Sequence, residues 1–451
     1  MTSAAEQFAS NINLSSFAKA EELKKRILFT IGALIIYRLG TYIPLPGIDS
    51  EAFARQFQQQ SGGLLGTLNI FSGGAVQRMA IFALNIMPYI SASIIVQLMT
   101  SVIPTLEKLK KEGEQGRRQI NQYTRYLTVG LATMQGYFIA VSMQNSTGGA
   151  PIVSEPGVFF LVTATVTLVG GVMFLLWLGE QITARGIGNG VSLIIFAGIV
   201  AELPRAAVGL LALGRGTAGA QSLPVGVVLL VIVMSLALVA FVVFMERSQR
   251  RIVVQYPRRQ VGMRMTQGEK SHLPLKLNTA GVIPPIFASS LLLLPATAAG
   301  AIGQDSPEWL QTLQIMFAPG RPLYMALYGA GILAFTFVYT SVVFNTQDVA
   351  DNLKKYGGFI QGYRPGARTA DYLDYVLSRL TLIGGLYLTL VCLTPEFLRA
   401  AYPSIPVYLG GTSLLIVVSV TLDTVGQIQG HLLAQQYESL IKKSKLRGGK
   451  K

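Results

Sequence analysis

Ten long apolar stretches, separated by polar segments, dominate this chain. They cover residues 27–43, 79–102, 126–143, 157–181, 187–204, 222–245, 278–299, 322–344, 380–397 and 405–430. Each stretch has about the 17–25 residues that a helix needs to cross a lipid bilayer. The pattern therefore predicts an all-α polytopic membrane protein with ten transmembrane helices.

The basic residues alternate in phase with these stretches. Of the 37 Lys and Arg residues, 30 fall on the first polar flank and on every second flank after it. Basic loops stay on the cytoplasmic side of a membrane. The bias predicts that both termini are cytoplasmic, with a polar N-terminal segment at 1–26 and a basic tail at 431–451.

Composition supports a membrane protein and leaves one further partner open. The chain is 51% hydrophobic and only 13% charged, whereas a soluble domain has about 25% charged residues. Basic loops explain the net charge of +15, and ribosomal RNA remains a compatible partner because those loops share one face. The single cysteine, Cys392, excludes a disulfide within the chain, and its apolar neighbours indicate a buried thiol.

Ten spans invite a division into two halves. If the chain divides after the fifth stretch, the halves at 27–204 and 222–430 each cross the membrane an odd number of times. Similar halves would then be inverted relative to each other, as in inverted-topology repeats. The segment 205–221, rich in Gly and Ala, is the expected external hinge. The residues show no internal repeat, so this symmetry is an inference from topology.

One apolar segment, residues 62–75, is too short to span and is framed by four glycines. A half-helix at membrane depth is tolerated only where protein surrounds it or where it lines a cavity. The pattern fits such a half-helix and an ordinary loop on the outer surface about equally well.

Two large basic loops are predicted to form structured surfaces. Residues 246–276 alternate basic and β-forming residues, which predicts a protruding hairpin. Residues 345–376 contain a short predicted helix that ends at Gly357 and Gly358, followed by a turn at 362–366. We interpret both loops as docking platforms for a cytoplasmic partner.

The sequence carries no pattern for catalysis. A GxxxxGK[ST] phosphate loop is absent, so any ATP-driven motor must be external. The run 186–190, Gly-Ile-Gly-Asn-Gly, follows a span rather than a strand and predicts a tight turn. His272 and His431 are isolated from other metal-ligating residues. We therefore expect neither an enzyme nor a bound cofactor or metal.

Polar groups within the stretches are few. Arg38 lies near the outer end of its span, where its side chain can snorkel, and Asp423 is the most deeply placed carboxylate. This scarcity argues against an ion-coupled transporter. The uncharged residues Asn85, Gln97 and Asn278 fit hydrogen bonds between helices or, alternatively, an interface that can separate.

Several uninterrupted motifs together resemble the bacterial SecY family, whose members form the central subunit of the Sec protein-conducting channel. The resemblance runs from about residue 20 to 447. The motifs lie at 43–49 (IPLPGID), 85–93 (NIMPYISAS), 104–106 (PTL), 111–114 (KEGE), 177–183 (WLGEQIT), 186–190 (GIGNG), 273–276 (LPLK) and 410–416 (GGTSLLI).

The resemblance implies ten helices in two inverted five-helix halves around a central hourglass pore. It identifies 62–75 as the plug, a short helix that closes the pore from outside, with Leu64, Leu65, Leu68, Ile70 and Phe71. It also implies an apolar pore ring, in which Val191 is smaller than the isoleucine often found there. The ring residues are Ile86, Ile90, Val191, Ile195, Ile286 and Ile416.

The resemblance further implies a lateral gate between spans two and three on one side and seven and eight on the other, with Gln97 and Asn278 near it. The family docks the SecA ATPase or a translating ribosome on its cytoplasmic loops. The corresponding arginines here are Arg250, Arg251, Arg258, Arg259, Arg264 and Arg364. Many relatives have two arginines where this chain has Met263 and Arg264.

The resemblance thus predicts a channel subunit of the bacterial inner membrane that works with SecE and SecG. It would pass signal-bearing, unfolded preproteins across the membrane and release transmembrane segments sideways into lipid. A secondary active transporter with inverted repeats is the alternative, and ionisable residues near the midplane would favour it.

Overall fold

The computed structural model describes most of the chain between residues 21 and 448. The described residues are 21–60, 66, 69, 71–144, 152–153, 155–215, 224–256, 260–261, 264–265, 270–301, 321–401 and 410–448.

Ten long helices form the body of the described structure, and each overlaps one of the ten predicted spans. Seven of them are long and apolar enough to cross a membrane, and α6 joined with α7 (Pro104–Lys111) would be an eighth, bent by 99°. The ten helices are α3 (Glu21–Gly40), α6 (Met87–Val102), α8 (Glu114–Gln144), α9 (Val158–Arg185), α10 (Gly190–Gly214), α11 (Val225–Arg247), α12 (Ile283–Ala301), α14 (Pro322–Val343), α16 (Ala367–Ala401) and α17 (Gly411–Gly448).

The two remaining helices, α3 and α12, are not among those long and apolar enough to cross a membrane, the first because of its charges and the second because of its length. Helix α3 has 20 residues but carries Glu21 and Glu22 in its first turn and Arg38 in its last. Helix α12 is apolar, and its part from Ile283 to Leu292 is shorter than a span. Both coincide with predicted spans, so the described helices agree with the ten-span pattern.

The predicted start of the second span, residue 79, is wrong. Residues 72–86 form turns, and helix α6 begins only at Met87. Met79 and Asn85 have φ angles of 44° and 48°, a left-handed backbone that interrupts a right-handed helix. Pro88 then lies in the first turn of α6, where proline is tolerated because its missing N–H has no helical partner.

Other helices are longer than their apolar stretches. Helices α8 and α16 begin about three turns before the predicted spans, and α17 continues through most of the predicted tail to Gly448. The predicted hinge at 205–221 begins as helix, because α10 continues through residue 214.

Each half of the chain has its own core, and one of the two cores crosses between the halves. The first hydrophobic cluster is built mainly by α3, α6, α8, α9 and α10, but it also contains Ile286, Ile416 and Val420 from the second half. The second cluster joins α11, α12, α14, α16 and α17. Helix α4 (Ser50–Gln60) adds Phe53 and Phe57 to the first cluster.

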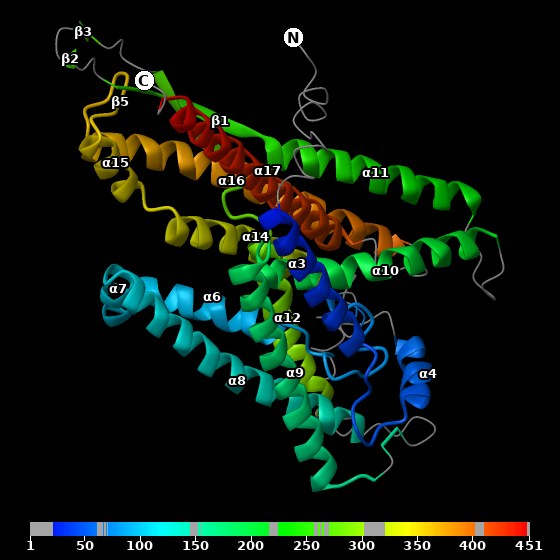
Figure 1. Cartoon of the computed structure of the whole chain (residues 1–451). Helices are drawn as coiled ribbons and strands as arrows, with labels where there is room; N and C mark the ends of the chain where they lie inside the picture. The colour runs from blue at the N-terminus through cyan, green and yellow to red at the C-terminus, as the bar shows by residue number, and fades with distance from the viewer. Residues whose placement is uncertain are drawn as a thin grey trace.

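The predicted hairpin is confirmed as part of a small sheet. Strands β1 (Gln249–Gln255) and β4 (Lys270–Lys276) pair antiparallel, with Ile252 opposite Leu273, and β5 (Phe359–Ile360) pairs with the other edge of β1. The short strands β2 (Gln260–Val261) and β3 (Arg264–Met265) pair with each other. Figure 1 shows this sheet and α15 at one end of the helical body, called the sheet end below.

The predicted short helix in the second loop is α15 (Thr346–Lys355). The Asn345 side chain caps it by accepting hydrogen bonds from the backbone N–H groups of Gln347 and Asp348. Gly357, with φ of 74°, follows its C-terminus. Buried residues of β1, β5 and α16 pack together beneath this helix, so the two loops form one rigid surface.

Candidate functional site

The six predicted ring residues lie together in one hydrophobic cluster, although they come from four helices and from both halves of the chain. Four of them are almost fully buried, with exposed fractions of 0% for Ile86, 4% for Ile195, 5% for Ile286 and 1% for Ile416. Ile90 and Val191 are half-buried at its edge. The structure therefore places all six in or against the cluster that both halves share, and their arrangement as a ring and their role as a constriction stay predictions.

Helix geometry explains how two pairs of ring residues reach this point. Ile86 is the N-cap residue of α6, and its carbonyl accepts a hydrogen bond from the N–H of Ile90 (3.1 Å). Val191 and Ile195 are likewise four residues apart, at the start of α10. Residues four apart lie on the same face of a helix. Each of these two helices therefore presents an adjacent aliphatic pair to the cluster.

The predicted tight turn at 186–190 is confirmed, and it positions α10. The Asn189 side chain accepts hydrogen bonds from the N–H groups of Val191 (3.1 Å) and Ser192 (3.4 Å). A Cβ at Gly190 would lie 2.0 Å from the carbonyl oxygen of Gly179. Only glycine allows α10 to begin this close to α9, and this contact fixes the position of Val191 at the start of α10.

A cavity of about 780 Å³ adjoins the first hydrophobic cluster on the side of the sheet end. It is lined by Val282 and Val420, which belong to or pack against that cluster, and by polar residues that include Asn189, Glu246 and Asp423. Asp423, predicted to be the most deeply embedded carboxylate, is 66% exposed and lies 3.7 Å from Lys276 Nζ. This acid therefore faces an open cavity rather than lipid.

The predicted plug residues Leu64, Leu65, Leu68 and Ile70 lie outside the described residues. Phe71 is described, is 6% exposed and belongs to the same cluster as the ring. Its backbone carbonyl accepts a hydrogen bond from the side-chain amide of Asn85. Asn85 thus bonds to the backbone of the predicted plug, whereas its polarity within an apolar stretch indicated a bond between spanning helices or an interface that can separate.

The predicted lateral gate corresponds to a direct helix interface, because α6 packs against both α12 and α14, and α8 packs against α12. Asn278 is 3% exposed. Its amide nitrogen donates to Glu246 Oε1 (2.7 Å) and to the Gly281 carbonyl (3.1 Å), within its own half of the chain. The buried Gln97 Oε1 has no hydrogen-bond partner among the described residues. Their role in a gate stays a prediction.

The predicted docking arginines spread over the sheet end. Arg250 and Arg251 are exposed on β1, where Ile252 and Val254 turn into the core beneath. Arg364 is exposed on the loop before α16, and its carbonyl accepts a hydrogen bond from Thr369 Oγ1 (2.8 Å). Arg264 lies on β3, and Arg258 and Arg259 lie outside the described residues.

Helix α7 adds basic residues near this surface. Lys110 Nζ donates to the carbonyl of Val342 at the end of α14 (3.3 Å). Lys111 pairs with Glu107 at 2.7 Å, and this hydrogen bond and charge lower the pKa of the Glu107 carboxyl. Lys111 and Glu107 are both on the surface, so their ion pair contributes little to stability.

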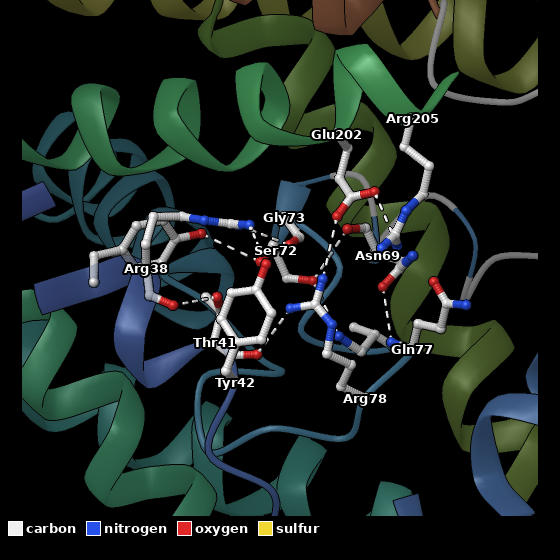
Figure 2. Close-up of polar contacts among 12 residues, drawn as sticks. Arg38, Thr41, Tyr42, Asn69, Ser72, Gly73, Gln77, Arg78, Glu202 and Arg205 are labelled. Carbon is white, nitrogen blue, oxygen red and sulfur yellow. Dashed lines mark hydrogen bonds and ion pairs between the residues drawn. The ribbon is translucent and has the colours of Figure 1, made fainter. Parts of the chain in front are cut away.

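A polar cluster around residues 71–79 was not predicted from the sequence. Arg38, predicted to snorkel outward, instead donates to the Gly73 carbonyl (2.9 Å). Glu202 on α10 lies 3.6 Å from Arg78 Nη2 and 3.5 Å from Arg205 Nη1. Figure 2 shows these side chains converging between α3 and α10. The sequence feature that could have indicated this cluster is Glu202, a carboxylate within the apolar stretch 187–204.

Among the described residues, no group of three or more His, Cys, Asp or Glu is arranged to hold a metal ion. The single cysteine, Cys392, is buried. Thr412 Oγ1 lies 3.7 Å from its sulfur atom. The candidate site is the hydrophobic cluster shared by both halves, with the cavity at the sheet end and the polar cluster around residues 71–79 beside it.

Comparison with known sequences gives consistent matches over nearly the whole chain. The sequence model of the SecY family matches residues 80–425. The chain is 54% identical over 428 residues to the protein translocase subunit SecY of Escherichia coli strain K12, covering 95% of this chain and 96% of that protein. It is 52% identical over 433 residues to the same subunit of Vibrio cholerae, covering 95% and 96%.

Comparison with solved structures gives the same fold. A protein conducting channel is similar with a TM-score of 0.62 at 16% identity, over 90% of this chain and 92% of that chain. A SecY channel studied for its plug domain gives a TM-score of 0.61 at 16% identity, with coverage of 90% and 92%. Sec61 in a canine ribosome-channel complex gives 0.58 at 16% identity, again over 90% and 92%. At this identity the likeness establishes the fold alone.

Proposed function

This chain belongs to the SecY family, and from that premise we infer that it is the channel subunit of a bacterial protein translocase. It passes unfolded secretory polypeptides across the inner membrane and releases transmembrane segments sideways into lipid. The observation that supports this function is that one hydrophobic cluster shared by both halves includes, or packs against, the six predicted ring residues.

An aliphatic ring suits a channel whose substrate changes with every residue. A translocating polypeptide presents charged, polar and apolar side chains in turn, and hydrogen-bond donors or charges in the ring would retain some of them. Isoleucine and valine offer no fixed polar partner. A narrow apolar constriction is also costly to wet, which opposes the leak of ions. We propose that Ile86, Ile90, Val191, Ile195, Ile286 and Ile416 form this ring.

The channel must also open sideways. A signal sequence or a nascent transmembrane helix belongs in lipid, and its backbone is satisfied there only after it forms a helix. We propose that the interface of α6 and α8 with α12 and α14 is this lateral gate, with Gln97 and Asn278 as its polar residues. Packing between apolar helices gains little over packing against lipid, so such an interface can part when an apolar segment enters.

Secondary transport is the weaker alternative. An ion-coupled transporter needs ionisable groups near the midplane of the membrane. Asp423 and Glu246 line the cavity at the sheet end, and Glu180 is paired with Arg125 at 2.7 Å. The buried Glu202 on α10 is compensated by Arg78 at 3.6 Å and Arg205 at 3.5 Å, so it is an ion-paired group rather than a free carboxylate for a coupling ion. We therefore propose a passive channel without enzymatic activity of its own.

We propose that the sheet end faces the cytoplasm and receives the external motor. The exposed arginines 250, 251 and 364 suit contacts with the SecA ATPase or with ribosomal RNA phosphates. A solved structure of similar fold was determined in a ribosome-channel complex, which supports the second of these partners. SecE and SecG would complete the channel complex, and both termini would be cytoplasmic.

The division into domains follows from the same topology and is likewise a proposal. The first half comprises 27–204 with the plug at 62–75, the hinge comprises 205–221, and the second half comprises 222–430 with loops 246–276 and 345–376. The terminal segments at 1–26 and 431–451 flank the channel on its cytoplasmic side.

Reconstitution in liposomes tests this function. The purified protein, supplied with SecE, SecG, SecA and ATP, should import a preprotein into the vesicle lumen. Without a preprotein it should not carry small solutes. Transport of small solutes by the chain, together with no import of any preprotein, would favour the transporter and contradict the channel.

A further inference from the structure

Residues 71–79, called the plug stem because they comprise the end of the predicted plug (62–75) and the turns that follow it, are fixed between two helices. Tyr37 on α3 donates its hydroxyl to the Ser72 carbonyl (3.2 Å), and Arg38 donates to the Gly73 carbonyl (2.9 Å). On the other side, a Cβ at Gly73 would lie 2.9 Å from the Cα of Gly198 on α10. The two backbones therefore touch, and the stem has no room to shift without parting from α10.

A buried carboxylate adds charge to this contact. The Glu202 side chain is only 2% exposed, and its Oε1 lies 3.6 Å from Arg78 Nη2. Its other oxygen, Oε2, has no hydrogen bond among the described residues and lies 3.5 Å from Arg205 Nη1. Arg205 is 58% exposed whereas Arg78 is 21% exposed. Arg78 is thus the less solvated of the two cations that compensate Glu202.

The position of Arg78 is set by groups other than Glu202. Its Nη1 donates to the Thr41 carbonyl (3.3 Å), and its guanidinium lies over the ring of Tyr42 at 4.0 Å. The stem residue is therefore held at the end of α3 and directed at α10 (Figure 2).

We propose that Arg78 and Glu202 form a latch that holds the plug stem against α10 and keeps the resting channel sealed. This inference rests on the proposed channel function. A buried charge that loses its partner is strongly destabilising, so moving the stem away from α10 would leave Glu202 with only the exposed Arg205. Any opening that displaces the stem must first break this pair, and the pair therefore sets how often the unoccupied channel opens.

A double-mutant cycle tests the latch. Arg78→Gln, Glu202→Gln and the double variant are reconstituted without preprotein, and the resting ion conductance of the vesicles is measured. Each single change should raise the conductance by about five- to thirtyfold, the factor that corresponds to a change of one to two kcal/mol in an equilibrium. The double variant should conduct no more than the leakier single variant, because residues in contact are not additive. Conductance at the wild-type level in the single variants, or increases that multiply in the double variant, overturn the proposal.

A substitution in the stem provides independent evidence. A Cβ at Gly74 would lie 2.4 Å from Glu202 Oε1 and 2.8 Å from Arg78 Nη2, so Gly74→Ala should raise the resting conductance as well. Gly113→Ala is the matched control, because Gly113 also has a positive φ but has no neighbour within 4 Å of the added atom. Equal conductance of both variants overturns the latch. If a Glu202 variant does not assemble, the resting conductance of the Gly74→Ala and Arg78→Gln variants tests the latch.

Two further controls distinguish a failure of the latch from a failure of the proposed channel function. Glu51 and Arg55 form an exposed ion pair at 3.6 Å on α4, and Glu51→Gln should leave the conductance unchanged. A comparable leak from this variant means that the effect is general surface charge and contradicts the latch. Import of a preprotein with a strong signal is measured in parallel. If even the wild-type complex imports nothing, the proposed function has failed, whereas normal import with unchanged leak in the latch variants refutes the latch alone.

Discussion

The side-chain amide of Asn85 donates a hydrogen bond to the backbone carbonyl of Phe71. Asn85 directly precedes Ile86, the first predicted ring residue, and Phe71 is the one predicted plug residue with a described position. Both residues are buried in the region of the first core cluster. This bond therefore ties the end of the predicted plug to the start of α6, which carries Ile90, while Ile86 is its N-cap.

Replacing Asn85 should loosen this tie. Asn85→Asp keeps a residue type that tolerates the left-handed backbone but removes the donor when ionised. The Phe71 carbonyl would then be buried without a partner, which costs about 1–3 kcal/mol. We expect lower thermal stability in detergent and a higher resting ion conductance. Asn121→Asp, at an exposed position on α8, is the control, and an equal loss of stability in that variant would contradict the role of Asn85.

The two predicted gate residues should respond to leucine in opposite directions. Gln97→Leu removes a buried acceptor that has no partner, which favours the closed interface by up to about 1–3 kcal/mol. Asn278→Leu instead removes the donor to Glu246 and frees the start of α12 from the end of α11. The ratio of export with a weakened signal sequence to export with an intact one should fall for the first variant and rise for the second.

Replacing both residues with leucine should also change this ratio. Export that keeps its discrimination between weak and intact signals in all three variants would remove Gln97 and Asn278 from the gate. A shift of both single variants in the same direction would contradict the physical reason given for them.

The exposed arginine at 250 should contribute to binding rather than to folding. Substitution of an exposed side chain usually changes stability by no more than about 0.5 kcal/mol. If Arg250 contacts an RNA phosphate, Arg250→Ala should reduce the slope of log affinity for ribosomes against log salt by about 1. Arg118→Ala is the control, because Arg118 is 82% exposed and 4.0 Å from Glu114 on α8. Identical salt slopes for Arg250→Ala and the wild type would exclude that contact.

The sequence predicts the helical architecture well because apolar length is a local property. The position of each of the ten helices follows from it, and so does the hairpin that pairs Ile252 with Leu273. The start of the second span does not follow. The residues from 79 to 86 are apolar enough for a span, and the left-handed backbone at Met79 and Asn85 depends on contacts with the plug stem.

The site is less predictable because its residues are ordinary in type. Ile86 is fully buried in the ring cluster, while Ile35 on α3 is 55% exposed, and both occur within apolar stretches. Only the family resemblance selects the ring residues. The pair of Arg78 and Glu202 joins residues far apart in the chain, so no local pattern reveals it. Such pairs become visible only when the helices are placed in space.

Disulfide trapping of a translocating chain tests the central claim most directly. In a Cys392→Ala background, which removes the only native thiol, cysteine is placed at Ile90 or Ile286 in the ring, and at the outward-facing Ile35 as a control. A secretory chain that carries one cysteine is arrested during import. We predict disulfide bonds to positions 90 and 286 and none to position 35. Absence of a bond at both ring positions, or equal bonding at position 35, would contradict passage through the ring.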